Sequence, residues 1–240
     1  MPSKTLKSII LPFVLPLLPI NRRTFDVLLN ELAAIRARVF ASCLPRRRLW
    51  LRRIRRQSSL KVNLGGGGQS PLGWLELDVR FHDNQSIPWD IRRGLPFASS
   101  SVRLIYASHV LEHVDFYNDA PLILRDCQRS LEPGGKIRLV VPDVEKFIGA
   151  YLGANGLSWS SLGFQNLPDD MPTGMCLLNH VFHQKGEHLF GYDFETLKYL
   201  LVMCGFKDVT LSSFRSSIQF PLELDLDVHE RYSLYVEALA

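Results

Sequence analysis

The sequence lacks closely spaced cysteines. Its four cysteines, Cys43, Cys127, Cys176 and Cys204, lie far apart and form no C-x-x-C pair. Small secreted domains that depend on disulfides carry a tight cysteine framework. The spacing therefore excludes such a scaffold and favours buried thiols in a reducing compartment.

The sequence also lacks an apolar run long enough to span a membrane. The best candidate, IILPFVLPLLPI at residues 9–20, is interrupted by three prolines and is followed by no A-x-A cleavage site. A spanning helix needs about 20 apolar residues, and a cleaved signal peptide ends in small residues. We therefore expect a cytoplasmic protein, with peripheral contact at the inner membrane surface as an alternative.

The excess of positive over negative charge is confined to the first quarter of the chain. Residues 1–60 hold 13 basic against two acidic residues, whereas the remaining 180 residues hold 15 against 22. A mildly acidic body argues against a catalytic face that grips nucleic acid, because phosphate binding depends mainly on Lys and Arg. We expect a basic, helical N-terminal extension at residues 1–59 and a separate domain at residues 60–240.

The extension contains two helix-like segments. Residues 21–44 have no proline or glycine, and their apolar positions at roughly helical spacing predict an amphipathic helix. Residues 45–56, PRRRLWLRRIRR, set seven arginines among apolar residues. This segment can contact an anionic membrane surface or another acidic partner. It can also be a solvated linker, or a helix that packs Trp50 on the body.

Strand-type and helix-type segments alternate after residue 59. Short apolar or alternating runs predict strands at residues 61–64, 74–79, 102–107, 136–142, 208–214 and 232–238. Helices are expected at residues 118–131, 143–151 and 193–204. This alternation predicts an α/β fold with a largely parallel sheet covered by helices. Residues 153–190, rich in Gly, Asn, Pro and His, are expected to form an irregular lid or binding loop.

Four glycines, Gly65 to Gly68, follow the first predicted strand directly. Glycines at the carboxyl end of a parallel strand let a ligand approach the backbone where a Cβ would collide. A dinucleotide fingerprint would require Gly or Ala at position 70, which is Ser70, and an acid about 20 residues on. The next strand instead ends at Asp78, and no Gly-Lys-Ser/Thr follows the loop. A nicotinamide-dependent dehydrogenase is therefore a weakly supported alternative.

Acidic residues end or follow the next strand. Asp78 ends the strand at residues 74–79, where a carboxylate can accept hydrogen bonds from both hydroxyls of a ribose. Asp90 precedes Ile91, and an acid followed by an apolar side chain suits an adenine amine and its ring. These residue types, following the glycine loop, favour an adenosine-containing ligand.

Further polar residues follow the predicted strand at residues 102–107, at the same edge of the sheet as the glycine loop and Asp78. Ser108, His109, Glu112 and His113 follow its carboxyl end, which is the binding edge of such sheets. Glu112 and His113 can equally be a helix-start pair with structural hydrogen bonds.

Four motifs in order resemble the class I S-adenosylmethionine-dependent methyltransferases of the type 11 kind. They are VNLGGGG, GWLELDV, WDIRRGLPFASSSVRLIYASHVLEHV and LRDCQRSLEPGGKIRLVVPDVEKF, within residues 60–150. The later pieces GEHLFGYDFETLKYLLVMCGF and HERYSLYVEA are similar to the C-terminal half of a bacterial subgroup. The resemblance implies a Rossmann-like, seven-stranded sheet whose last strand is antiparallel, with S-adenosyl-L-methionine as cofactor.

The resemblance also implies the residues that bind this cofactor. Gly65 and Gly67 would face its methionine part, Asp78 its ribose, and Asp90 with Ile91 its adenine. Ser108 and His109 would border the methionine end. Gly66 completes the loop at a position where the family usually has Cys or Ser, a difference we expect to be harmless. Only residues 65–73 join the first two strands, too few for a full crossover, so we expect a stunted first helix.

The implied reaction is methyl transfer to oxygen or nitrogen of a small-molecule or glycan acceptor. A hydroxyl acceptor needs a general base, and His109, His183 and His188 are the candidates because histidine suits neutral pH. His180, His183 and His188 have the spacing H-x2-H-x4-H, which matches no common zinc motif, so no metal is expected. Two alternatives are a catalytically inactive cofactor-binding scaffold at a membrane and an RNA methyltransferase that uses the arginine-rich arm.

Overall fold

A computed structural model describes residues 22–43, 45–80 and 86–240 of the chain. The apolar segment at residues 9–20 lies outside the described residues. The helices are α2 (Arg22–Cys43), α3 (Pro45–Ile54), α4 (Asp119–Ser130), α5 (Val144–Leu152), α6 (Gly174–His183) and α7 (Phe194–Met203). The strands are β1 (Leu60–Leu64), β2 (Leu75–Asp78), β3 (Ser86–Pro88), β4 (Val102–Ser108), β5 (Leu131–Pro142), β6 (Lys207–Ser212) and β7 (Ser233–Leu239).

The seven strands form one sheet in the order β3-β2-β1-β4-β5-β7-β6. Strands β3, β2, β1, β4 and β5 run parallel, whereas β7 is antiparallel to both β5 and β6. The predicted α/β fold with an antiparallel last strand is therefore confirmed. Because the parallel strands all end at one edge, the residues that follow β1, β2 and β4 meet there.

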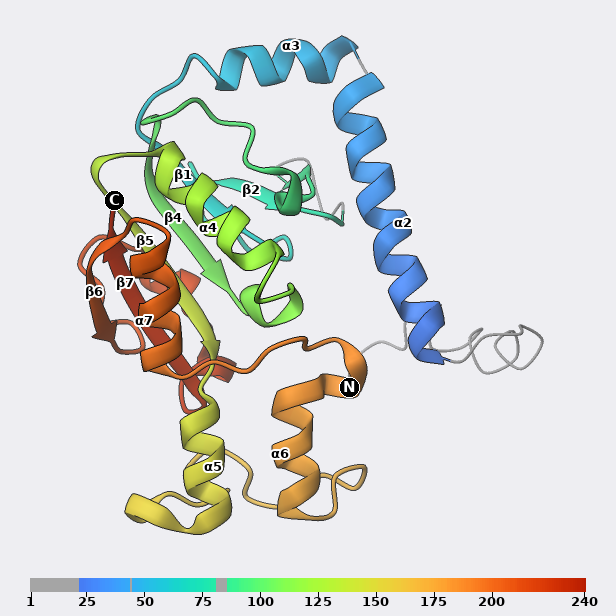
Figure 1. The fold of residues 1–240 in the computed structure, drawn as a ribbon, viewed down its shortest axis with the longest axis vertical. Helices are drawn as coiled ribbons and strands as arrows, with labels where there is room; N and C mark the ends of the chain where they lie inside the picture. The colour runs from blue at the N-terminus through green and yellow to red at the C-terminus, as the bar shows by residue number, and fades with distance from the viewer. Residues whose placement is uncertain (1–21, 44, 81–85) are drawn as a thin grey trace.

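Two apolar layers cover the sheet. Helices α4 and α7 lie on one face (Figure 1), where their apolar side chains join the main core with Val62, Leu64 and Ile105. A second cluster, which includes Trp74, Tyr106 and Phe220, brings together side chains of β4, β5 and β7 with those of two loops. These layers fix the sheet edge that carries the candidate site.

Helix α2 lies beside the edge strand β3 (Figure 1). It turns Ala34 and Ala37 inward, while Val27, Leu28, Leu32, Ile35 and Val39 are about half exposed. The predicted helix is present, but these five large apolar side chains face away from the body, whereas Phe25 and Leu29 are partly buried. No helix in the described part of the chain is long and apolar enough to cross a bilayer.

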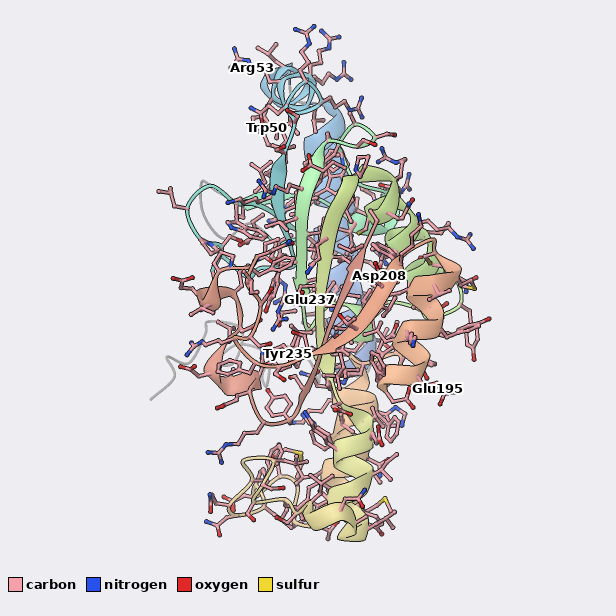
Figure 2. All side chains as sticks on the ribbon, turned by 90° about the vertical axis from the view of Figure 1, so that its left-hand side faces the viewer. Trp50, Arg53, Glu195, Asp208, Tyr235 and Glu237 are labelled. Carbon is pink, nitrogen blue, oxygen red and sulfur yellow. The ribbon has the colours of Figure 1, made fainter. Side chains whose placement is uncertain are left out.

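The arginine-rich segment is the helix α3. Trp50 packs against the main core and Ile54 is buried, whereas the neighbouring Arg52 and Arg53 are exposed. Figure 2 shows Trp50 on the side of α3 that faces the sheet and Arg53 on the opposite side. The structure thus shows a helix that packs Trp50 on the body, whereas contact of its exposed arginines with a membrane surface or an acidic partner stays a prediction.

Residues 153–190 are not the irregular loop that the sequence predicted, because they contain α6. Thr173 caps this helix, its hydroxyl accepting a hydrogen bond from the Cys176 N–H at 3.2 Å. Leu177 and Val181 on α6 are buried, and Val181 belongs to a small core with residues of α5. Figure 1 shows α5 and α6 side by side at the end of the sheet where β5 stops. The abundance of polar residues around this helix concealed it.

Candidate functional site

The glycine loop follows β1 and lies against the segment that follows β4. Gly65, Gly67 and Gly68 have φ values of 66°, 60° and 84°, in the left-handed region that favours glycine. A Cβ on Gly65 would lie 2.6 Å from Cγ2 of Val110. Close approach between the ends of β1 and β4 therefore requires glycine at position 65.

A buried polar network holds the loop in shape. The Ser70 hydroxyl donates to Oε2 of Glu76 at 2.6 Å, and the Asn63 amide donates to Ser70 at 3.0 Å. The Gly68 N–H donates to Oε1 of Glu76 at 2.8 Å. A Cβ on Gly66 would lie 2.5 Å from Oε2 of Glu76. This network leaves no room for a side chain at position 66, so glycine fits there, and the expectation that this difference from the family is harmless stays a prediction.

Replacing Gly66 with alanine is expected to lower the free energy of unfolding by about 1–3 kcal/mol, because the added methyl group forces Glu76 from its partners. Thermal unfolding measures the loss, at about 2–4 °C in Tm for each kcal/mol in a chain of this size. Gly67→Asn is the control, because a Cβ at Gly67 meets no atom within 4 Å and Asn tolerates the left-handed region. Equal Tm values for the two variants would contradict the prediction.

Asp78 is the last residue of β2 and lies beside the glycine loop. Its Oδ2 accepts a hydrogen bond from the Gly67 N–H at 3.3 Å, and its Oδ1 accepts one from the Arg80 N–H at 2.8 Å. The side chain is half-buried. No helix lies between β1 and β2, so the expected stunting of the first helix is confirmed. The structure thus places a carboxylate within reach of a ligand on the glycine loop.

Asp90 caps the short helix η2 (Ile91–Arg93) and is only 3% exposed. Its carboxylate forms ion pairs with Arg38 of α2 and with Arg92, and Arg92 also pairs with Glu31 of α2 at 2.7 Å. Burial alone would raise the pKa of Asp90, but the hydrogen bonds from Arg92 and Arg38 lower it overall. Asp90 therefore joins α2 to the sheet, a role that the sequence did not reveal, and its contact with adenine stays a prediction.

His109 occupies a strained position directly after β4. Its φ of 54° lies in the left-handed region, which costs a non-glycine residue of order 1–3 kcal/mol and is most frequent at functional sites. Its N–H donates to the Val140 carbonyl at 2.8 Å, so the backbone of β5 holds this conformation. Ser108, the preceding residue, is half-buried at the end of β4.

Four other side chains surround the imidazole of His109. Its Nδ1 lies 3.0 Å from Oε1 of Glu112, and its Nε2 lies 3.0 Å from the hydroxyl of Ser233. The ring of His229 stacks on it with centroids 3.8 Å apart, and Tyr232 lies edge-on at 6.0 Å. The sequence analysis missed His229, Tyr232 and Ser233 because more than 100 residues separate them from His109.

His229 remains neutral far below the usual histidine range. Burial, with a smaller contribution from the adjacent His109, lowers the pKa of this ring to about 4. The unfolded chain therefore binds a proton on His229 at a higher pH than the folded chain does. The burial of neutral His229 therefore costs no stability above about pH 6.5, whereas the free energy of unfolding decreases as the pH falls from there toward 4.

The His229→Gln variant is expected to lose less stability than wild type between pH 6.5 and 4, because it removes this proton uptake on unfolding. Tm measured across that range tests the difference, with the exposed His183→Gln as matched control. Parallel curves for wild type and His229→Gln would contradict the assignment.

The other two predicted catalytic histidines lie in different places. His183 is exposed at the end of α6, whereas His188 is buried and its Nδ1 lies 2.6 Å from the Val181 carbonyl. Burial lowers the pKa of His188, so this ring stays neutral at pH 7. Its ring meets that of His113 at 4.9 Å. His109 therefore lies next to Glu112, and His188 lies next to His113, whereas the exposed His183 belongs to neither pair.

Residues 77–139 match the family model described as a methyltransferase domain. No curated protein matches the chain. Among solved structures, the chain is similar to S-adenosylmethionine-dependent methyltransferases from Archaeoglobus fulgidus and Mesorhizobium loti. The first is 14% identical, with 88% of this chain and 94% of that chain covered and a TM-score of 0.45. The second is 18% identical, with 80% and 96% covered and a TM-score of 0.45.

Proposed function

We propose that this chain, which contains a class I S-adenosylmethionine-dependent methyltransferase domain, methylates oxygen or nitrogen of a small-molecule or glycan acceptor. The cofactor of such domains is S-adenosyl-L-methionine. One observation carries the proposal. The glycine loop, the Asp78 carboxylate and the imidazole of His109 lie at the carboxyl ends of three neighbouring parallel strands, β1, β2 and β4, so one ligand at that edge can reach all of them.

The residues at this edge fit the cofactor. The left-handed glycines expose backbone to a ligand, and the half-buried Asp78 can accept both ribose hydroxyls. Ile91 offers an apolar surface to adenine, next to the paired carboxylate of Asp90. The bound cofactor supplies an electrophilic methyl group on a sulfonium centre. Within this proposal the chain binds and orients that group, and Gly66 keeps the loop in the required shape.

His109 is the general base in this proposal. With the carboxylate of Glu112 near Nδ1, we assign the ring proton to Nδ1, which leaves the lone pair of Nε2 beside the Ser233 hydroxyl. An acceptor hydroxyl can therefore pass its proton to Nε2, directly or through Ser233. The negative charge of Glu112 then stabilises the imidazolium that forms. His188 also lies close to Glu112, whereas His183 is exposed at the end of α6.

A transfer assay with a labelled methyl group tests the function. Purified protein is incubated with S-adenosyl-L-methionine and separate pools of hydroxylated small molecules, amines, oligosaccharides and total RNA. We expect label in a small-molecule or oligosaccharide pool, and none in RNA at physiological salt. Label in RNA alone would favour the alternative that uses the arginines of α3. Cofactor binding without transfer to any pool would favour an inactive scaffold.

A further inference from the structure

Three potential metal ligands meet at the carboxyl edge, beside the cluster around His109. Glu112 and His113 come from the short helix η3 (Leu111–His113), and His188 follows α6. One ligand atom from each residue lies within 4.8 Å of those of the other two. We propose that Glu112, His113 and His188 form a binding site for a divalent first-row transition metal ion.

The carboxylate of Glu112 provides the first argument. The residue is 1% exposed, and neither of its oxygens has a hydrogen-bond partner among the described residues. The Nδ1 of His109 lies 3.0 Å from Oε1, but an imidazole that acts as a general base brings no positive charge, and Oε2 meets no donor in the described part of the chain. A buried charge normally requires a paired charge or a metal ion, since its desolvation costs several kcal/mol. A cation at the two imidazoles supplies that partner.

The orientation of the two imidazoles provides the second argument. The Nδ1 of His113 lies 3.1 Å from the Glu187 carbonyl, and the Nδ1 of His188 lies 2.6 Å from the Val181 carbonyl. A carbonyl only accepts hydrogen bonds, so each Nδ1 carries the ring proton and each Nε2 keeps a lone pair. Metal-binding histidines show this arrangement, with the other ring nitrogen donating to a carbonyl or carboxylate.

The backbone fixes the three residues relative to one another. The Leu189 N–H donates to the carbonyl of Glu112 at 2.7 Å, which ties the segment after His188 to η3. Two imidazoles and one carboxylate suit zinc, iron, cobalt or nickel, and three protein ligands leave a coordination position open. The sequence predicted no metal, because the spacing of His180, His183 and His188 matches no common zinc motif. The site proposed here was missed because two of its ligands, Glu112 and His113, lie about 75 residues before His188.

An ion at this site would act on the acceptor, a consequence that rests on the proposed function. A hydroxyl at the open position would become more acidic, so that its proton would pass more readily to water or to a base at the site. The oxygen then forms a bond to the methyl carbon as the carbon–sulfur bond breaks and S-adenosylhomocysteine leaves as a neutral thioether. The proposal of the metal site itself does not depend on this step.

Cobalt titration of the chelator-treated, untagged full chain tests the site, because bound Co²⁺ absorbs visible light. We expect one Co²⁺ per chain, displaced by Zn²⁺. Glu112→Gln and His188→Ala are expected to weaken Co²⁺ binding by at least about tenfold. His113→Ala is expected to do the same, and since His113 is exposed its replacement leaves the core intact. His183→Ala, which changes an exposed histidine five residues before His188, is the matched control and should bind as wild type does.

Absence of saturable Co²⁺ binding would overturn the proposal, as would equal binding by wild type and His113→Ala or equal loss in His183→Ala. Cofactor binding, measured separately, distinguishes this failure from that of the proposed function. Binding of one Co²⁺ per chain without binding of S-adenosyl-L-methionine would support the metal site and contradict the proposed function. Binding of S-adenosyl-L-methionine without binding of Co²⁺ would support the proposed function and contradict the metal site.

Discussion

Replacing Arg138 with methionine is expected to lower the free energy of unfolding by about 3–5 kcal/mol, because it leaves the buried carboxylate of Asp225 without its cation and leaves Glu237 paired with Lys136 alone. Arg138 lies on β5 and is 0% exposed. Its Nη2 lies 2.5 Å from Oδ2 of Asp225, and its Nη1 lies 2.7 Å from Oε1 of Glu237 on β7. Methionine keeps much of the volume and removes the charge.

Further contacts show why the chain cannot relax easily around this change. Arg138 also donates to the Ser212 hydroxyl and to the Ser213 carbonyl, both at 2.8 Å, so it joins β5 to the end of β6. Burial opposes a charge on Arg138, but the hydrogen bond and charge of Asp225 raise its pKa overall. The guanidinium therefore remains charged at neutral pH.

Urea unfolding of Arg138→Met and wild type measures this difference. Arg103→Met is the matched control, since Arg103 is exposed on the neighbouring strand β4 and is expected to change stability by no more than about 0.5 kcal/mol. A loss below about 1 kcal/mol for Arg138→Met would mean that the buried ion pairs contribute little.

Replacing His109 with glutamine is expected to lower kcat by about 100- to 10,000-fold, the range for loss of a general base. Glutamine keeps a hydrogen-bonding side chain near Ser233 and Glu112 but cannot take up a proton at neutral pH. The effect on kcat should exceed any effect on cofactor affinity, since His109 acts on the acceptor proton.

The acceptor identified by the labelled-methyl assay serves for this measurement. The rate of His109→Gln should rise with pH, because solvent base replaces the missing imidazole, and wild type should level off. His183→Gln tests the competing candidate in parallel. Full activity of His109→Gln, or a loss confined to His183→Gln, would remove His109 from the mechanism.

The sequence predicted the sheet well because its strands carry local signals. The apolar runs at β1, β4 and β5 are bounded by turn residues. In the same way, Asp143 marks the start of α5 and Asp193 the start of α7, since each caps its helix. The strand β3 escaped prediction because three residues leave no periodicity to read. Helix α6 escaped because its apolar positions are set among His, Asn and Gly residues.

Only part of the candidate site could be predicted from the sequence. Gly65 and Asp78 belong to motifs that follow two adjacent strands, so their proximity was expected. The ion pair of Arg38 with Asp90 and the stacking of His229 on His109 join residues 52 and 120 positions apart, and no local pattern marks such pairs. Glu112, His113 and His188 likewise come together as a possible set of metal ligands only when the chain folds.

Calorimetric titration of the full chain with S-adenosyl-L-methionine, S-adenosylhomocysteine and NADH tests the central claim most directly. We predict micromolar binding of the first two and none of NADH. Asp78→Ala should weaken both by about 10- to 150-fold, the equivalent of about 1.5–3 kcal/mol for a hydrogen bond to a charged group. Asp169→Ala, an exposed loop position, should bind as wild type does. Absence of binding by S-adenosyl-L-methionine and S-adenosylhomocysteine, or binding of NADH instead, would contradict the assignment of this chain as a methyltransferase.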